Sequence, residues 1–340
     1  MKYERCLLTG ATGFLGYYVA EALLASGRKV VALARDPGSE AAQRLGERVE
    51  WVQGDILDVD AVAKAAQGCD ALLHCAGKVS RDAEDAIALH ETNVVGTQRV
   101  FEAAKKAGIR RAVHASTSGT IGISRDSEHI ANEDDPTPTA LINRWPYYRA
   151  KLYAERAALE YDGSDMEVVS VNPSLLLGPG DLHGSSTEDV QRFLEQRIPV
   201  SPAGGYSFVD ARDAAAGMVL ALEKGKAGER YLLTACNCTV RTFFNRVARV
   251  ADVEPPLFAL PNNGRAKKLS LFLARAASKF MDDEGMPDPE SIDMAQHYWY
   301  VDASKAEREL GWTSRDGMVT LADTVADLRE RGLVMLAAPQ

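Results

Sequence analysis

The stretch Thr9-Gly10-Ala11-Thr12-Gly13-Phe14-Leu15-Gly16 follows a short apolar run and opens an apolar helical pattern. Gly10 allows a tight turn out of a strand, Gly13 lets backbone N–H groups approach a pyrophosphate, and Gly16 lets the helix pack closely on the sheet. A helix that begins near Phe14 would point its positive end at the phosphates. Glycines at this spacing between a strand and a helix predict a dinucleotide site rather than a plain structural turn.

The first 115 residues alternate short apolar runs with helical stretches, and another helix and strand follow before Asn172. Apolar runs of this kind between helices are typical of a parallel sheet that is covered on both faces. We therefore predict an α/β fold with a doubly wound, Rossmann-type parallel sheet, whose ligands lie at the carboxyl ends of the strands. The expected strands are residues 6–9, 29–33, 49–52, 71–75, 111–115, 168–171 and 230–233, and the expected long helices are residues 14–26, 84–106 and 147–161.

The pattern loosens after Asn172-Pro173, where glycines and prolines become frequent. We expect residues 1–172 to form the dinucleotide-binding domain, with 206–235 returning to it and Phe208-Val209-Asp210 re-entering the main layer. Residues 173–205 and 236–335 are expected to form a smaller, mostly helical substrate-binding subdomain. Within it, Lys267–Met281 is basic and amphipathic, which favours a helix packed on this subdomain over one on a membrane surface. Such a helix can also roof an apolar substrate pocket.

Composition and charge exclude several classes of protein. The chain has 48 acidic and 39 basic residues, a net charge of −9, which argues against nucleic acid as its main ligand. No apolar run reaches the roughly eighteen residues of a membrane span, and the amino terminus does not read as a secretory signal. We therefore expect a cytoplasmic protein. The cysteines and histidines are scattered, and Cys236-Asn237-Cys238 lacks a second ligand pair, so neither disulfides nor a metal site are predicted.

Tyr147 is the only one of the eleven tyrosines with a lysine, Lys151, four residues on. On a helix, residues i and i+4 share one face, so both side chains can point into the same cleft. A free phenol has a pKa of about 10. A nearby ammonium, together with an oxidised nicotinamide, is expected to lower that pKa and to make proton exchange possible. Such a pair alone is common on helix surfaces, but behind the glycine loop it favours a catalytic role.

Motifs along essentially the whole chain occur in the order of one known family. The chain resembles the extended short-chain dehydrogenase/reductase family, is similar to NAD-dependent epimerases and dehydratases, and comes closest in motifs to the dihydroflavonol 4-reductase branch. The matching motifs are Thr9–Gly16, Gly54-Asp55-Ile56, His74-Cys75-Ala76-Gly77, Thr92–Thr97, Ser116-Thr117-Ser118, Tyr147 with Lys151, Asn172-Pro173-Ser174 and Ser304–Trp312.

This resemblance implies roles for individual residues. Thr117, Tyr147 and Lys151 would be catalytic, with the Thr117 hydroxyl donating to the substrate oxygen and holding the charge that develops there. Ser116 and Ser118 stay open as alternatives to Thr117. Ser118 and Leu175 would contact substrate, and Asn93 would support the geometry of the site. The implied cofactor-binding residues are Gly10, Thr12, Gly13, Phe14, Leu15, Gly16, Arg35, Asp55, Ile56, Ala76, Gly77, Lys78, Asn93, Tyr147, Lys151, Pro173 and Ser174.

The end of the second strand bears on the choice of cofactor. NAD-binding relatives use an acid there to grip the adenosine ribose, whereas this chain has Ala34 followed by Arg35. Because a guanidinium pairs bidentately with a 2′-phosphate, we expect NADP(H) in preference to NAD(H). NAD(H) is the alternative if Arg35 is a solvated surface residue or if Asp36 takes the role of the acid.

The stretch Val171–Gly180 is apolar and lacks the arginine that sugar-nucleotide enzymes of this family usually carry there. Leu175 to Leu177 would line an apolar pocket. We therefore predict an NADP(H)-dependent oxidoreductase that reduces a ketone or aldehyde of a fairly apolar small molecule, with Tyr147 as general acid. An NAD-dependent nucleotide-sugar epimerase or dehydratase with tightly bound NAD is the alternative. A non-catalytic NADP(H)-binding redox sensor is a more distant one, because sensors of that kind typically lose the Tyr-x-x-x-Lys pair.

In the family, the helices corresponding to residues 84–106 and 147–161 often pair across a two-fold axis. We expect a homodimer, with a monomer as the alternative because the outer faces of these helices are charged. The charged residues are Arg99, Lys105, Lys106, Arg156 and Glu160.

Overall fold

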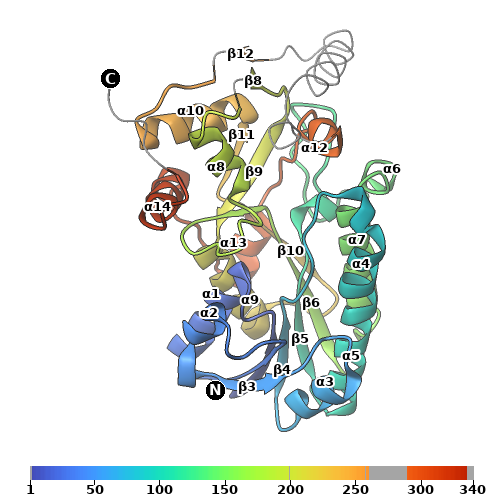
Figure 1. Ribbon diagram of the computed structural model, residues 1–340. Helices are drawn as coiled ribbons and strands as arrows, with labels where there is room; N and C mark the ends of the chain where they lie inside the picture. Colours follow the sequence, from blue (N-terminus) through green and yellow to red (C-terminus); the bar gives the residue numbers. More distant parts are fainter. Residues whose placement is uncertain (1, 199, 257, 260–288, 335–340) are drawn as a thin grey trace.

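A seven-stranded sheet forms the centre of the molecule, and each of its neighbouring strands pairs in parallel (Figure 1). The computed structural model describes residues 2–198, 200–256, 258–259 and 289–334. The strand order is β10-β6-β5-β4-β1-β2-β3. From β1 the chain adds strands first on one side (β2, β3) and then on the other (β4, β5, β6, β10), as in a doubly wound Rossmann fold, which confirms the predicted fold class. The strands are β1 (Arg5–Thr9), β2 (Lys29–Ala34), β3 (Glu50–Gln53), β4 (Ala71–His74), β5 (Arg111–Ala115), β6 (Glu167–Pro173) and β10 (Arg230–Leu233).

Helices cover both faces of this sheet, because neighbouring residues of one strand point to opposite sides. Leu8 of β1 is buried in one core with α1 (Phe14–Ala25) and α9 (Ala211–Lys224). Leu7, its neighbour, is buried in a second core with α3 (Val59–Ala66), α5 (Gly96–Lys106) and the end of α7 (Pro146–Leu159). In Figure 1 these two groups of helices flank the sheet. The continuous apolar runs of the sequence reflect this burial on both sides.

The helix predicted over residues 84–106 is interrupted in its backbone geometry. It starts with a 3₁₀ turn (Ala83–Asp85) and α4 (Ala86–His90), passes through a π-helical turn (Glu91–Val95), and continues as α5. Asn93, one of the predicted site residues, lies in the π-helical turn. Such π-helical turns are often found at functional sites.

The prediction that Phe208-Val209-Asp210 re-enters the main layer is wrong. These residues belong to β9 (Gly205–Asp210), the middle strand of a separate three-stranded sheet of order β11-β9-β7. The outer edge of β6 is already paired with β10. Strand β9 therefore pairs with β7 (Leu175–Leu177), which leaves the main sheet after Pro173, and with β11 (Cys236–Thr239). The chain returns to the main sheet only through α9 and β10.

The second sheet and its helices form the mostly helical carboxyl-terminal part of the chain, as predicted. Phe208, Phe243 and Leu321 are buried together in its core. The predicted helix Lys267–Met281 lies outside the described residues. Within them, no helix combines the length and apolar character that crossing a membrane requires. The remaining elements are α2 (Glu40–Gln43), α6 (Thr139–Ile142), α8 (Glu188–Leu194), α10 (Val240–Ala251), α12 (Pro289–Met294), α13 (Ser304–Leu310), α14 (Gly317–Glu330), β8 (Val200–Ser201) and β12 (Phe258–Ala259).

Candidate active site

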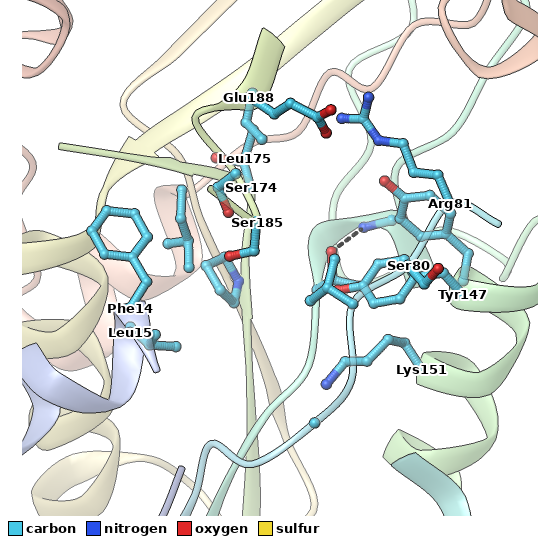
Figure 2. Close-up of a pocket in the computed structure, with 18 of the residues that line it drawn as sticks. Phe14, Leu15, Ser80, Arg81, Tyr147, Lys151, Ser174, Leu175, Ser185 and Glu188 are labelled. Carbon is cyan, nitrogen blue, oxygen red and sulfur yellow. Dashed lines mark hydrogen bonds between the residues drawn. The ribbon is translucent and has the colours of Figure 1, made fainter. Parts of the chain in front are cut away.

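A cavity of about 1440 Å³ lies at the carboxyl ends of the main strands, where the second sheet and α8 face them (Figure 2). This is the edge at which doubly wound sheets bind their ligands. The structure brings fourteen of the predicted site residues together in the wall of the cavity. They are Gly10, Gly13, Phe14, Leu15, Gly16, Gly77, Lys78, Thr117, Ser118, Tyr147, Lys151, Pro173, Ser174 and Leu175.

The glycine loop has a geometry that only glycine allows. Gly10 has φ +77°, and a Cβ on Gly16 would lie 1.9 Å from the carbonyl oxygen of Gly10. The loop closes through a hydrogen bond from the Gly13 N–H to the same oxygen, 2.9 Å long. Helix α1 starts directly afterwards, and no side chain caps its first turn. Backbone N–H groups at the positive end of a helix therefore face the cavity, which is the arrangement that fits a pyrophosphate.

Lys151 is anchored at the bottom of the cavity. Its Nζ donates to the backbone oxygen of Ala115, at the end of β5, over 2.6 Å, and the residue is only 8% exposed. Burial lowers the pKa of Lys151 to about 8, and the carboxylate of Glu155 acts in the opposite direction. The side chain is therefore mostly charged at neutral pH. A cation held in this way can orient a ligand hydroxyl and stabilise a nearby anion.

Tyr147 lies one turn before Lys151 on α7, and Figure 2 shows the two side chains on the same wall of the cavity. The ammonium does not outweigh burial at this phenol, while the predicted effect of an oxidised nicotinamide stays a prediction. Burial raises the pKa of Tyr147 above its ordinary value, and Tyr148 adds to the effect. The physical reason is that loss of hydration disfavours the phenolate, while the ammonium is directed toward the oxygen of Ala115. The phenol therefore keeps its proton at neutral pH.

Four hydroxyl groups line the cavity close to the end of β5 and after β6. Thr117 Oγ1 accepts a hydrogen bond from the N–H of Gly119 at 3.3 Å. The hydroxyls of Ser116 and Ser174 are buried and have no hydrogen-bond partner among the described residues. Ser118 is the fourth. Buried polar groups are normally hydrogen-bonded, so these two hydroxyls are exceptions that lie in residues of the cavity wall.

Asn93 is hydrogen-bonded to the backbone of Lys78, a residue of the cavity wall. Its Oδ1 accepts from the Lys78 N–H at 2.8 Å and its Nδ2 donates to the Lys78 carbonyl at 3.0 Å. Gly77 leaves room for this contact, because a Cβ there would lie 2.9 Å from Asn93 Oδ1. The Lys78 ammonium is paired with Asp85 at 2.7 Å. Asn93 itself does not line the cavity, so it can act on a bound molecule only by ordering this loop.

The predicted adenosine-side residues do not line the cavity either. Arg35 follows β2 and is exposed, and Asp55 Oδ1 accepts from the Leu57 N–H at 2.8 Å. Ile56 is buried against Gly96, and the Ala76 N–H donates to Thr9 Oγ1 at 3.3 Å. The predicted site residues outside the cavity wall are thus Thr12, Arg35, Asp55, Ile56, Ala76 and Asn93.

The expected leucine lining is only partly correct. Leu175 and Leu176 line the cavity, whereas Leu177 is fully buried in the core of the second sheet. The end of β7 turns this side chain toward that core, where Phe208 and Val240 are also buried.

Sequence reasoning also missed an aromatic wall. The rings of Tyr148 and Trp299 lie 4.7 Å apart between centroids, and both line the cavity with Tyr206. Gly119 makes room for this packing, because a Cβ there would lie 2.3 Å from Tyr148. Trp299 and Tyr206 come from distant parts of the chain, so no local pattern could have placed them beside Tyr148.

Residues 6–234, most of the chain, match the family described as "NAD dependent epimerase/dehydratase family". The chain belongs to this family. The dihydroflavonol-reductase resemblance is confirmed as well: the chain is 33% identical to a "Putative dihydroflavonol 4-reductase" of Synechocystis, over 96% of this chain and 95% of that protein. It is 32% identical to "Sterol demethylase protein B" of Methylococcus capsulatus, over 96% of this chain and 99% of that protein.

A solved structure has the same fold over nearly the whole length of this chain. The crystal structure of gox2253 superposes with a TM-score of 0.84 at 28% identity, covering 98% of this chain and 100% of that one. Family membership and the glycine loop together make this protein an NAD(P)-dependent enzyme of the oxidoreductase and epimerase type.

Proposed function

We propose that the protein is an NADP(H)-dependent carbonyl reductase that acts on an uncharged, fairly apolar ketone or aldehyde. One observation carries the choice of substrate class: each lysine and arginine among the described residues of the cavity wall already has a protein partner. A nucleotide sugar brings a diphosphate, which needs uncommitted cations. The pairs are Lys78 with Asp85, Arg81 with Asp189, Arg192 with Glu188, and Lys151 with the Ala115 carbonyl.

Two relatives support this choice through their names. One name refers to a dihydroflavonol and the other to a sterol, and both are ring systems without a phosphate. The aromatic wall of Tyr148, Tyr206 and Trp299 suits a flat apolar molecule of this kind.

The side chains of the site supply the proton and position the carbonyl group of the substrate. The bound dinucleotide would supply the hydride. Tyr147, protonated because burial raises its pKa, donates its proton to the carbonyl oxygen. The hydroxyl of Thr117 donates a hydrogen bond to the same oxygen and holds its developing charge. Lys151 stays cationic below about pH 8 and stabilises the phenolate that remains on Tyr147.

The preference for NADP(H) rests on Arg35. Its guanidinium has no partner among the described residues, and it stands at the carboxyl end of β2, where the adenosine ribose binds in this fold. A free guanidinium at this place suits a 2′-phosphate and gives no hydrogen-bond acceptor to a ribose diol.

Analysis of the nucleotide that the purified protein carries tests the proposal against the epimerase alternative. The protein is denatured without prior addition of cofactor, and the released nucleotides are separated and quantified. A reductase releases its cofactor in each cycle, so we expect a largely empty site that then binds NADPH with higher affinity than NADH. A stoichiometric amount of released NAD would instead support an epimerase or dehydratase.

A further inference from the structure

An ion pair in the cavity wall joins the loop after β4 to helix α8. Arg81 lies in the loop after β4, and Asp189 lies in the first turn of α8. The contact is bidentate: Nη1 donates to Oδ1 and Nη2 donates to Oδ2, both at 3.0 Å. Figure 2 shows Arg81, Tyr147 and Lys151 on the same side of the cavity.

The ion pair is open to the cavity. Both residues belong to its wall, and the side chains of Arg81 and Asp189 are 35% and 17% exposed. Two N–H groups of Arg81 are used by Asp189, and the others have no acceptor among the described residues. Among the described residues, each carboxylate oxygen of Asp189 accepts one hydrogen bond, from Arg81, and so keeps a lone pair for a further donor. The pair can therefore donate a hydrogen bond to a ligand and accept one from it.

The charged side chains at and beside the Arg81–Asp189 pair form two neutral ion pairs. Asp189 neutralises Arg81, and next to it on α8 Glu188 pairs with Arg192 at 3.0 Å. A carboxylate or phosphate that approached Arg81 would be repelled by Asp189. A hydroxyl or a carbonyl oxygen meets no such repulsion. Tyr148 and Tyr206 line the same cavity as this pair, so the cavity offers aromatic ring surface as well as polar groups.

From this geometry we infer that the Arg81–Asp189 pair is the binding subsite for the distal end of the substrate. It recognises an uncharged hydrogen-bonding group, a phenol, hydroxyl or ring carbonyl, on a flat ring system whose reacting carbonyl lies at Tyr147. The ring packs on the aromatic wall, Arg81 donates to the distal oxygen, and Asp189 accepts from a distal hydroxyl. The inference rests on the proposed function, because it places the reacting carbonyl at Tyr147.

Three probes of one shape test the inference. They are 4-phenylbutan-2-one and the same ketone with a para-hydroxyl or a para-carboxylate on the ring. Their Kd values are measured by calorimetry on the full-length protein saturated with NADP⁺, so the readout is binding and not turnover. In the wild type we expect the hydroxyl probe to bind about tenfold tighter than the unsubstituted probe, as one additional hydrogen bond predicts, and the carboxylate probe to bind weakest.

Two variants and one control distinguish recognition of the ligand by the Arg81–Asp189 pair from a purely structural role of that pair. Arg81→Met should abolish the advantage of the hydroxyl probe and leave the unsubstituted probe nearly unchanged. Asp189→Asn should free the charge of Arg81 and strengthen binding of the carboxylate probe about tenfold. Arg192→Met, which removes the other charge-paired arginine of the cavity wall, should keep the wild-type ranking.

Other rankings would overturn the inference. If Arg81→Met weakens all three probes equally, the pair only holds the two sides of the cavity together. If the carboxylate probe binds tightest in the wild type, the subsite takes anions. Should Arg81→Met fail to fold, the nearly isosteric Asp189→Asn still gives a decisive result. A protein that ranks the probes as expected but reduces none of them would contradict the proposed function and leave the subsite intact.

Discussion

The ammonium of Lys151 donates to the carbonyl oxygen of Ala115 over 2.6 Å, and this bond joins α7 to the end of β5. It fixes the rotation of the helix relative to the sheet. Because Tyr147 is one helical turn earlier, the same bond determines that this phenol, and not the phenol of Tyr148, stands on the wall that Lys151 shares. Tyr148 instead packs on Trp299.

Tyr147→Phe should reduce kcat by at least about a hundredfold, because it removes the proton that Tyr147 delivers to the carbonyl oxygen, and general acid catalysis supplies a factor of this order. The Kd for NADPH should change little. Tyr148→Phe is the matched control on the adjacent position and should be much milder. Steady-state kinetics and a fluorescence titration of NADPH measure both quantities. If the two variants exchange their behaviour, the roles assigned to the two tyrosines are wrong.

The pH dependence should report the state of Lys151. Burial lowers its pKa to about 8, so the ammonium is present below that pH and is lost as the pH rises through it. We therefore expect kcat/KM for reduction to fall with an apparent pKa near 8. The other titratable groups around Lys151 are His74, Cys75, His114, Tyr147 and Glu155; burial keeps the first three neutral at this pH.

A substitution at Glu155 tests the role of the Lys151 charge in a second way. Its carboxylate is buried, accepts from Thr120 Oγ1 at 3.0 Å and from Asn172 Nδ2, and lies 3.5 Å from Arg230. It opposes the effect of burial on Lys151. Glu155→Gln keeps the shape and removes the charge, so the alkaline limb of the kcat/KM profile should move to lower pH. Glu160→Gln, at the exposed end of the same helix, is the control. An unmoved limb would mean that Glu155 is only structural.

Arg35→Ala should weaken NADPH binding roughly ten- to a hundredfold, because a charge-assisted bidentate contact contributes about 1.5–3 kcal/mol. NADH lacks the 2′-phosphate and should bind almost as before. Because Arg35 is exposed, added salt should diminish the effect. Titrations of both cofactors at two ionic strengths measure this. A wild type that prefers NADH, with a mutation that alters both cofactors equally, would favour Asp36 as the ribose contact.

The expected homodimer has a candidate surface on α4 and α7. Ile87 is 75% exposed and Tyr153 is 40% exposed, and both line a shallow pocket together with His90 and Arg149. We expect light scattering at micromolar concentration to give the mass of a dimer, and Ile87→Asp to give a monomer, because a buried unpaired carboxylate is costly at an interface. A wild-type monomer at this concentration would contradict the prediction.

Much of the fold could be predicted because its decisive features are local. The apolar runs of β1 to β6 and β10 lie between helices, and the glycine spacing of residues 10–16 has a direct steric cause. The partnership of β9 could not be predicted in this way. It depends on which sheet edge is free after β10 has paired with β6, and this is decided by the whole topology.

In the candidate site, too, local relationships could be predicted from the sequence and contacts between distant residues could not. Tyr147 and Lys151 are one turn apart, and Glu155 continues their spacing, so its place near Lys151 could also have been read from the sequence. Arg81 and Asp189 are 108 residues apart, and no local pattern links them. The effect of burial on the pKa of Tyr147 could not be predicted, because spacing shows a neighbouring charge but not the degree of burial.

In the proposed reaction, a hydride moves from NADPH to a carbonyl carbon with Tyr147 as the proton donor. NADPH that carries deuterium at the transferred position of C4 tests it directly, with the para-hydroxyl ketone probe as substrate and mass spectrometry of the product. We expect one deuterium on the carbinol carbon of the alcohol, one NADPH consumed for each alcohol formed, and no such product from Tyr147→Phe. Unchanged activity of Tyr147→Phe, or rapid inversion of an alcohol centre on bound cofactor with no net NADPH consumption, would contradict it.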